Sequence, residues 1–433
     1  MRRLPPERIM ELLGRLRAPS PSVGPSVSPP GRRPVSVLYG GAHLFHAGSA
    51  QKLGRIARGL FEREILGTSD VVALVGEEAR PHAEAVIAKV SAKLAREPVE
   101  DLRADFEDGY GVRTDAEEDA DAERVGQELA RGLREGTLPP FVGIRVRALD
   151  GLTGGRAART LERVLSSLLE GSGAQLPPGF VVTLPKVTGP EQVAAFAELL
   201  DIAEETFGLA PGSLRLELMI EASSTLITAD GRVGLMDLVA AARGRCTSLH
   251  LGAYDLTADV GVVARAQSLG HPICRAAREI MLLATAGSGV AVVDGATTLL
   301  PIAARSGAGA PPGGSEGDRA RIRGAMALHV ADVRRALDLG IFQGWDLHPG
   351  QLVTRYIALY TFFAEALDDA SRRLSAFVAS AARATATGTA FDDAATARSL
   401  AGFFLRGLAA GALDPEDLAS AGLSAEELSR LRG

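Results

Sequence analysis

The chain of 433 residues has little cysteine, little lysine and no long apolar run. Its two cysteines, Cys246 and Cys274, are too few for a disulfide framework or a cysteine-based zinc site, and they are consistent with a reducing compartment. No run of about 18 apolar residues indicates a membrane span, and the N-terminal sequence lacks the uninterrupted apolar stretch of a secretory signal. We therefore expect a soluble protein of the cytoplasm.

Positive charge is also not in excess, because 47 Lys+Arg stand against 53 Asp+Glu and the net charge is -6. This balance excludes a global positive field, so neither nucleic acid nor an anionic membrane is expected as a partner. Only four of the basic residues are lysines, which makes a lysine inside a motif conspicuous. The hydrophobic share of 46% argues against a mainly disordered chain.

Proline and glycine divide the chain into segments. Eight of the 23 prolines lie in residues 1–34, where they cannot sustain a helix or a central strand, so this segment is predicted to be an N-terminal extension and linker. A stretch rich in glycine and proline at residues 306–318 predicts an irregular loop or lid. Residues 366–433, rich in alanine and leucine, predict an added C-terminal helical segment. The remaining residues, 35–365, are predicted to form the catalytic domain.

Within that domain, short apolar segments alternate with helical patterns, as in βα units that build a parallel sheet. The predicted strands are Val35–Tyr39, Leu102–Phe106, Phe141–Arg147, Phe180–Lys186, Leu214–Glu221, Thr247–Gly252, Val290–Asp294 and Phe342–His348. Eight such units favour a closed (β/α)8 barrel, and no glycine-rich dinucleotide motif follows the first strand to favour a doubly wound sheet. The predicted fold is thus an α/β TIM barrel with an extension at each end.

Two predicted strands carry charges on the face expected to point into the barrel. Alternation along the third strand places Arg145 and Arg147 on one face, so we expect both guanidinium groups to point inward. Buried charge is costly without a partner, and the structural alternative is an ion pair, with Glu217 as one candidate. In the fifth strand Glu221 stands at the C-terminal end, where barrels of this type carry their chemistry.

Other polar residues cluster after the predicted strands. Carboxylates follow the second and sixth predicted strands, in DFEDGYG at residues 105–111 and in GAYDLTADVG with Asp255 and Asp259. At one mouth of the barrel these carboxylates would repel one another unless a cation binds. Hard oxygen ligands favour Mg2+ or Mn2+, although helix caps and solvated loop acids remain the alternative. Lys186 in LPKV could hold a substrate carboxylate, form a Schiff base or pair with an acid. His348 is either a polar wall of the site or structural, and His250 is expected to be an interior residue.

Taken in order, seven motifs resemble the superfamily of the citrate lyase beta subunit, malyl-CoA lyase and pyruvate-dependent sugar-acid aldolases. They are SVLYGG, DFEDGYG, IRVRALDG, LPKV, IEAS, GAYDLTADVG and DLHPGQ, and they span about residues 35–352. Each motif is short, but seven in the right order at predicted strand ends are a strong signal. The resemblance implies a phosphoenolpyruvate/pyruvate-type barrel.

The resemblance also implies roles for individual residues. Glu221 and Asp255 correspond to the ligands of a divalent metal, and Arg145 to the arginine that contacts the metal-bound substrate oxygen. Glu107 and Asp108 correspond to the paired acids that support this site. In the branch that cleaves acyl-CoA, a C-terminal acid completes the site of a neighbouring subunit, and Asp392 in GTAFDDAA resembles it, so a homo-oligomer is expected.

The chain departs from these families at three places. GGAHLFH stands where a V-P-G turn is usual, Arg147 where many members have asparagine, and Thr188 where glutamate often follows the lysine strand. These departures leave the metal chemistry of the family in place. They leave open whether an acyl-CoA thioester is used.

The predicted function is that of a metal-dependent carbon–carbon lyase, an aldolase or acyl-CoA lyase, acting on a 2-oxo acid or enolate. One alternative is a lyase that uses Lys186 as a Schiff base. The other is a noncatalytic barrel that binds 2-oxo acids and serves a regulatory or partner-binding role. The general base is left open between metal-bound hydroxide, Asp392 and His348. Arg147 and His348 are further candidates for substrate binding, and the substrate, the cation and the number of subunits also remain open.

Overall fold

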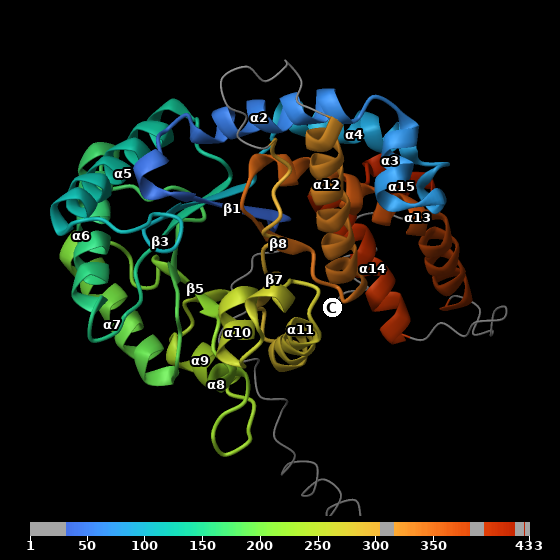
Figure 1. Cartoon of the computed structure of the whole chain (residues 1–433). Coiled ribbons are helices and arrows are strands. Elements are labelled where there is room, and N and C mark those ends of the chain that lie inside the picture. Colours follow the sequence, from blue (N-terminus) through green and yellow to red (C-terminus); the bar gives the residue numbers. More distant parts are fainter. Residues whose placement is uncertain (1–31, 304–315, 382–393, 421–427, 429–433) are drawn as a thin grey trace, which may run out of the picture.

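Parallel strands of the described residues close into a barrel in the order β1 to β8, as Figure 1 shows. The strands are β1 (Ser36–Gly41), β2 (Asp101–Asp105), β3 (Phe141–Arg145), β4 (Val181–Leu184), β5 (Arg215–Ile220), β6 (Cys246–Leu251), β7 (Ala291–Asp294) and β8 (Gln343–Asp346). Each lies within a residue or two of its predicted position. The prediction of a (β/α)8 barrel is therefore confirmed.

The structure is a computed structural model that describes residues 32–303, 316–381, 394–420 and 428. The predicted linker over residues 1–34 lies almost wholly outside the described residues, as do most of the predicted loop at residues 306–318 and Asp392.

Helices surround the barrel and connect its strands (Figure 1). The longer ones are α2 (Ser49–Glu64), α3 (Thr68–Val75), α4 (Ala83–Arg96), α5 (Asp115–Glu135), α6 (Gly154–Ser172), α7 (Pro190–Phe207), α11 (Pro272–Thr285), α12 (Glu316–Asp338), α13 (Pro349–Ala381) and α14 (Ala394–Ala410). Shorter ones are η1 (Ala42–Leu44), η2 (Glu77–Ala79), α8 (Ser223–Leu226), α9 (Leu235–Ala241), α10 (Ala253–Asp259), η3 (Ala264–Ala266) and α15 (Pro415–Ser420). None of the described helices is long and apolar enough to cross a membrane.

The strands have two different faces because alternate side chains point to opposite sides of the sheet. In β5, Leu216, Leu218 and Ile220 are fully buried in the main hydrophobic cluster, which also contains residues of the surrounding helices. The alternate residue Glu217 lies beside Thr183 of β4 and Ser248 of β6 in the strand register. The barrel thus has an apolar outer layer and a polar interior.

The C-terminal helices pack on the chain's own barrel. Helix α13 runs through residue 365 without a break and contacts α2, α4 and α12. Helix α14 lies against α13, where the rings of Phe363 and Phe403 are 4.8 Å apart and the Tyr360 hydroxyl donates to the Ala410 carbonyl at 3.2 Å. Before α15, Asp414 pairs with Lys89 of α4 at 2.8 Å. These contacts bury the apolar faces of the tail within one chain.

Candidate active site

Four carboxylates surround the ammonium group of Lys186 at the C-terminal ends of the strands. The distances from Lys186 Nζ to the nearest oxygens are 2.7 Å for Asp255, 3.6 Å for Asp108, 3.8 Å for Glu221 and 3.9 Å for Glu107. The sequence motifs placed all five residues at strand ends, and the structure brings them together. We call these five residues the acidic cluster.

Local geometry explains how the strand ends deliver these groups. Glu221 follows β5 directly, and one of its oxygens accepts the backbone N–H of Lys186 at 2.6 Å. Lys186 has a positive φ of 52°, unusual for a residue with a side chain. Asp255 lies in the first turn of α10, after Gly252, where a Cβ atom would come within 2.2 Å of the Glu221 side chain. Only glycine therefore allows β6 to end so close to Glu221.

Arg145 lies beside the acidic cluster and is held on several sides. It is 1% exposed and makes two hydrogen bonds of 2.6 Å to Asp105, while its Nη1 is 3.3 Å from a Glu107 oxygen. Its guanidinium carbon lies 5.0 Å and 5.2 Å from the ring centres of Tyr39 and Trp345. Arg145 thus points inward as predicted, and its donors are fixed in place.

One hydrogen bond of this arginine goes to a weak acceptor, and a donor beside it has no partner in the described part of the chain. The hydrogen bond of Arg145 Nη1 goes to the sulfur of Met219 at 3.3 Å, and thioether sulfur is a weak acceptor. The indole N–H of Trp345 is buried and finds no acceptor among the described residues. The mouth of the barrel therefore retains donor capacity for a ligand or water.

The acidic cluster carries more negative than positive charge, and the pKa values reflect it. Burial raises the pKa of Glu221 to about 6, with a further contribution from the charge of Asp255. Burial likewise raises the pKa of Glu107 to about 7, and the neighbouring Asp108 adds to the effect. Burial alone would lower the pKa of Lys186, but the surrounding carboxylates, Glu221 foremost, raise it overall. The cluster holds the lysine as an ammonium ion.

A second polar network fills the barrel beneath the mouth and was missed in the sequence. Arg103 of β2, 1% exposed, pairs with Asp101 and with Glu217, at 2.7 Å for the latter. The partner suggested for Arg145 or Arg147 was Glu217, and this is wrong because Arg103 occupies that carboxylate. The alternation of Asp101, Arg103 and Asp105 in β2 was the signal that could have revealed it. His250, buried beside Ser248 at 2.9 Å, is the interior residue that was expected.

Neither Arg147 nor His348 pairs with a carboxylate of the acidic cluster among the described residues. Strand β3 ends at Arg145, so the alternation no longer holds at Arg147, whose Nε donates to Glu118 of α5 at 2.8 Å. The expectation that Arg147 points into the barrel is therefore wrong. Nδ1 of His348 accepts the N–H of Gly350 at 3.0 Å, at the start of α13. This contact fits the structural alternative for His348.

The loop acids Asp105 and Asp259 have protein partners of their own. Asp105 binds Arg145 and also accepts the backbone N–H groups of Glu107 and Gly109. Asp259 is exposed and accepts the N–H of Ser223 at 2.7 Å. Asp105 therefore supports Arg145, and Asp259 links the end of α10 to the start of α8.

The acidic cluster fits a divalent cation by its chemistry, since its carboxylate oxygens are the hard ligands that Mg2+ and Mn2+ prefer. In the described part of the chain, no three His, Cys, Asp or Glu side chains already form a metal-binding arrangement. In the acidic cluster the Lys186 ammonium lies 3.8 Å from a Glu221 oxygen and 2.7 Å from an Asp255 oxygen. A cation that uses both carboxylates has to displace this side chain, which is 31% exposed.

Solved structures with a similar fold include a citrate lyase of Burkholderia xenovorans, at a TM-score of 0.58 and 19% identity over 90% of this chain and 97% of that chain. A malate synthase of Haloferax volcanii, in a pyruvate/acetyl-CoA ternary complex, gives a TM-score of 0.46 and 16% identity over 92% of this chain and 97% of that chain. The protein CitE of Mycobacterium tuberculosis, in complex with magnesium and pyruvate, gives a TM-score of 0.39 and 16% identity over 76% of this chain and 90% of that chain. The first likeness confirms, at the level of fold, the citrate lyase type of barrel that the motifs predicted.

The fold and the site thus define a (β/α)8 barrel, similar in fold to a citrate lyase, with an acidic cluster at its mouth. No curated protein matches the chain. Residues 25–432 match the model of a family described as a domain of unknown function, DUF6986, and the chain belongs to this family.

Proposed function

We propose that the protein is a divalent-metal-dependent enzyme that breaks or forms a carbon–carbon bond beside the carbonyl of a 2-oxo acid. Aldolases and acyl-CoA lyases are the two forms of this chemistry that the sequence motifs indicate. The observation that supports the proposal is the convergence of four carboxylates from three different strand ends on one point. That point lies at the C-terminal mouth, where (β/α)8 barrels carry their active sites.

In this proposal Glu221 and Asp255 hold the cation, and Glu107 and Asp108 support the site. When bound, Mg2+ or Mn2+ supplies Lewis-acid polarisation of the substrate carbonyl. The excess of carboxylates over cations in the acidic cluster is the electrostatic reason for expecting a cation there. Burial is the main reason that the pKa values of Glu107 and Glu221 are raised, and a cation held beside them would offset the cost of burying their charge.

Arg145 is proposed to donate a hydrogen bond to the substrate oxygen on which negative charge develops. Asp105 holds its Nε and Nη2, which leaves Nη1, hydrogen-bonded to the Met219 sulfur and 3.3 Å from a Glu107 oxygen, as the donor that can turn to substrate. A donor fixed before the reaction stabilises the developing charge without a cost of reorientation, and its contribution is greatest in the transition state. The rings of Tyr39 and Trp345 exclude water from one side of this guanidinium.

The Schiff-base alternative is less well supported. A lysine has to lose its proton before it attacks a carbonyl, and catalytic lysines of this kind have a lowered pKa. The pKa of Lys186 is raised instead, and its Nζ lies 2.7 Å from the Asp255 carboxylate. This arrangement favours a role for Lys186 as the counter-ion of the acidic cluster rather than as a nucleophile. A noncatalytic barrel that binds 2-oxo acids would show metal-dependent binding without turnover.

The experiment that tests the proposal is an activity screen of the purified chain with Mg2+ or Mn2+. Oxaloacetate, malyl-CoA-like thioesters and pyruvate/aldehyde pairs are the substrates, and the products are identified chemically. The proposal expects turnover that a chelator abolishes and added metal restores. Turnover that survives chelation and leaves a borohydride-trapped adduct on Lys186 would instead establish the Schiff-base route.

The assembly of subunits stays a prediction alongside this function. A homo-oligomer in which Asp392 reaches the barrel of a neighbouring subunit is the arrangement that the resemblance implies. Mixing inactive Glu221→Ala and Asp392→Ala chains tests it. Shared sites regain partial activity in mixed oligomers, whereas sites within one chain do not.

A further inference from the structure

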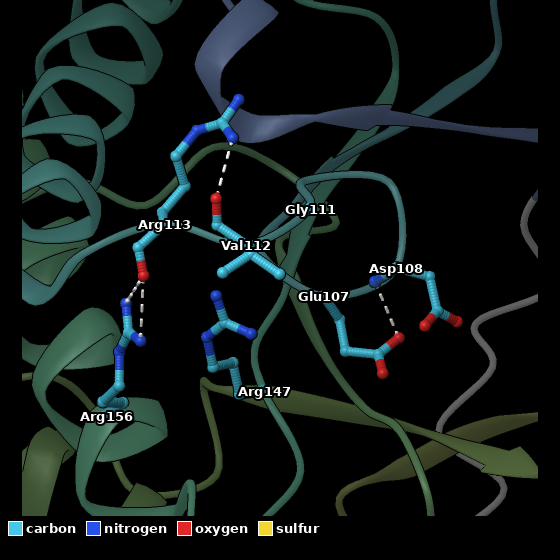
Figure 2. A pocket seen from close by; sticks show the side chains of 7 residues that line it. All are labelled: Glu107, Asp108, Gly111, Val112, Arg113, Arg147 and Arg156. Carbon is cyan, nitrogen blue, oxygen red and sulfur yellow. Dashed lines mark hydrogen bonds between the residues drawn. The ribbon is translucent and has the colours of Figure 1, made fainter.

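A cavity of about 310 Å³ lies beside the acidic cluster and has walls of opposite charge. Glu107 and Asp108 form one wall, and Arg147 and Arg156 form the other, with the loop of Gly111, Val112 and Arg113 between them, as Figure 2 shows. The volume is at the lower end of the range for small-molecule sites. Because Glu107 and Asp108 belong to the acidic cluster, the cavity adjoins the candidate active site.

The two walls differ in how well their charges are matched. The acids face the cations of the active site, since Glu107 and Asp108 lie 3.9 Å and 3.6 Å from Lys186 Nζ. On the other wall, Arg147 and Arg156 share the buried carboxylate of Glu118, and Arg156 also pairs with the exposed Asp115 at 3.1 Å. Among the described residues Arg147 pairs with Glu118 alone and shares it with Arg156, so the charge of Arg147 is the less fully neutralised of the two.

Arg147 has donors left over for a ligand. Its Nε binds Glu118, while neither Nη nitrogen makes a hydrogen bond to the protein within the described ranges. Figure 2 shows its guanidinium group directed into the space between Val112 and Arg156. Arg156 is fixed more fully, because its Nη atoms donate to the Arg113 carbonyl at 3.3 Å and it also binds Glu118. Arg147 is therefore the adjustable cation of the cavity.

We propose that this cavity is an anion subsite that binds a second acidic group of the substrate, remote from the reacting carbonyl. Arg147 is its specificity-determining residue and binds the oxygens of a carboxylate or a phosphate through its planar fork. Arg145 and Arg147 are two residues apart, which separates their backbones by roughly 7 Å in an extended chain. The subsite selects a short acid with anionic groups at both ends over a monoacid. This assignment rests on the proposed function, which places the 2-oxo acid group at the acidic cluster.

Calorimetric titration of the full chain in Mn2+ tests the subsite with three probes, pyruvate, 2-oxoglutarate and inorganic phosphate. The proposal expects 2-oxoglutarate to bind wild type more tightly than pyruvate. Arg147→Met should weaken the binding of 2-oxoglutarate at least roughly tenfold, which equals about 1.4 kcal/mol, and leave the binding of pyruvate unchanged. Unchanged pyruvate binding also shows that the variant is folded. Equal losses for both oxo acids, or no loss for either, would overturn the proposal.

A second variant approaches the subsite from the loop between the two walls, without touching the Arg147–Glu118 pair. Val112 is 96% exposed, so Val112→Glu should fold normally and weaken 2-oxoglutarate by repulsion, whereas the matched Val112→Gln should not. Equal effects of the two substitutions would contradict the charge argument.

The titration with inorganic phosphate distinguishes a subsite for carboxylates from one that also binds phosphates. It also distinguishes failure of the subsite from failure of the proposed function. Phosphate that competes with 2-oxoglutarate in wild type, and not in Arg147→Met, supports a subsite that also accepts phosphate esters. A carboxylate-only subsite binds 2-oxoglutarate and ignores phosphate. If no oxo acid binds, the proposed function fails, and phosphate binding that depends on Arg147 still supports the subsite. Without that binding the subsite fails as well.

Discussion

Replacement of Lys186 by methionine is expected to tighten the binding of a divalent cation at the acidic cluster. The ammonium group lies 2.7 Å from Asp255 Oδ2 and 3.8 Å from Glu221 Oε1, so a cation that binds both carboxylates has to displace it. Methionine is unbranched at Cβ, as lysine is, and should tolerate the positive φ at this position equally well. The substitution removes the competing charge and leaves the four carboxylates in place.

The size of the effect follows from the exposure of the side chain. Lys186 is 31% exposed and makes four contacts of 2.7–3.9 Å with carboxylate oxygens. Partly solvated ion pairs contribute about 0.2–1 kcal/mol each, and pairs that share one side chain add incompletely, so we estimate about 1–3 kcal/mol for the four together. Because about 1.4 kcal/mol corresponds to a tenfold change in affinity, the Kd for Mn2+ should fall roughly 5- to 150-fold.

The assay is a titration with Mn2+, followed by the electron paramagnetic resonance signal of the free ion. Lys52→Met is the matched control, because Lys52 is an exposed lysine of α2 and its loss makes the same change in net charge. The reasoning is refuted if Lys186→Met binds Mn2+ no more tightly than wild type. It is also refuted if Lys52→Met tightens binding by the same factor.

Three further predictions concern the arginines and one buried acid. Arg145→Lys should lower kcat/KM by at least about 100-fold in steady-state assays, because lysine lacks the planar donor geometry, and an unchanged value would count against its role. Arg103→Met leaves two buried carboxylates without their cation and should lower the free energy of unfolding by about 3–5 kcal/mol in denaturant titrations, whereas the exposed Arg80→Met should cost less than about 1 kcal/mol. Burial would raise the pKa of Asp346, but the charge of its arginine partner lowers it overall, so its stabilising contribution is present above pH 3.8 and is lost as the pH falls below that value. Asp346→Asn should therefore lower stability at pH 7 and flatten its acid dependence, and an unflattened curve would contradict this.

Much of the barrel was predictable because its strands are short apolar runs with a regular alternation. In β5 the pattern of Leu216, Leu218 and Ile220 identified the outward face, and all three are buried there. The residues of the acidic cluster were predictable for a related reason. In a closed parallel barrel every strand ends at the same mouth, so Glu221 and Asp255, each just after a strand, had to lie near one another.

Contacts between side chains from distant segments were not predictable in the same way. Pairing depends on which side chains meet across the barrel, where Arg103 of β2 reaches Glu217 of β5 although these two strands are not neighbours in the sheet. Arg147 was misplaced because the alternation was extended two residues beyond the end of β3. The position of the Lys186 ammonium depends on a positive φ that no sequence pattern indicated.

The most direct test of the central claim is calorimetric binding of Mn2+ to wild type, Glu221→Gln, Asp255→Asn and the control Asp259→Asn. Asp259 is an exposed acid that contacts Ser223 outside the acidic cluster. We predict that wild type and the control bind Mn2+ with the same affinity, and that each of the other two variants binds at least roughly tenfold more weakly, a loss of about 1.4 kcal/mol. Wild type that binds no Mn2+, or Glu221→Gln and Asp255→Asn variants that bind it as tightly as the control, would contradict the account.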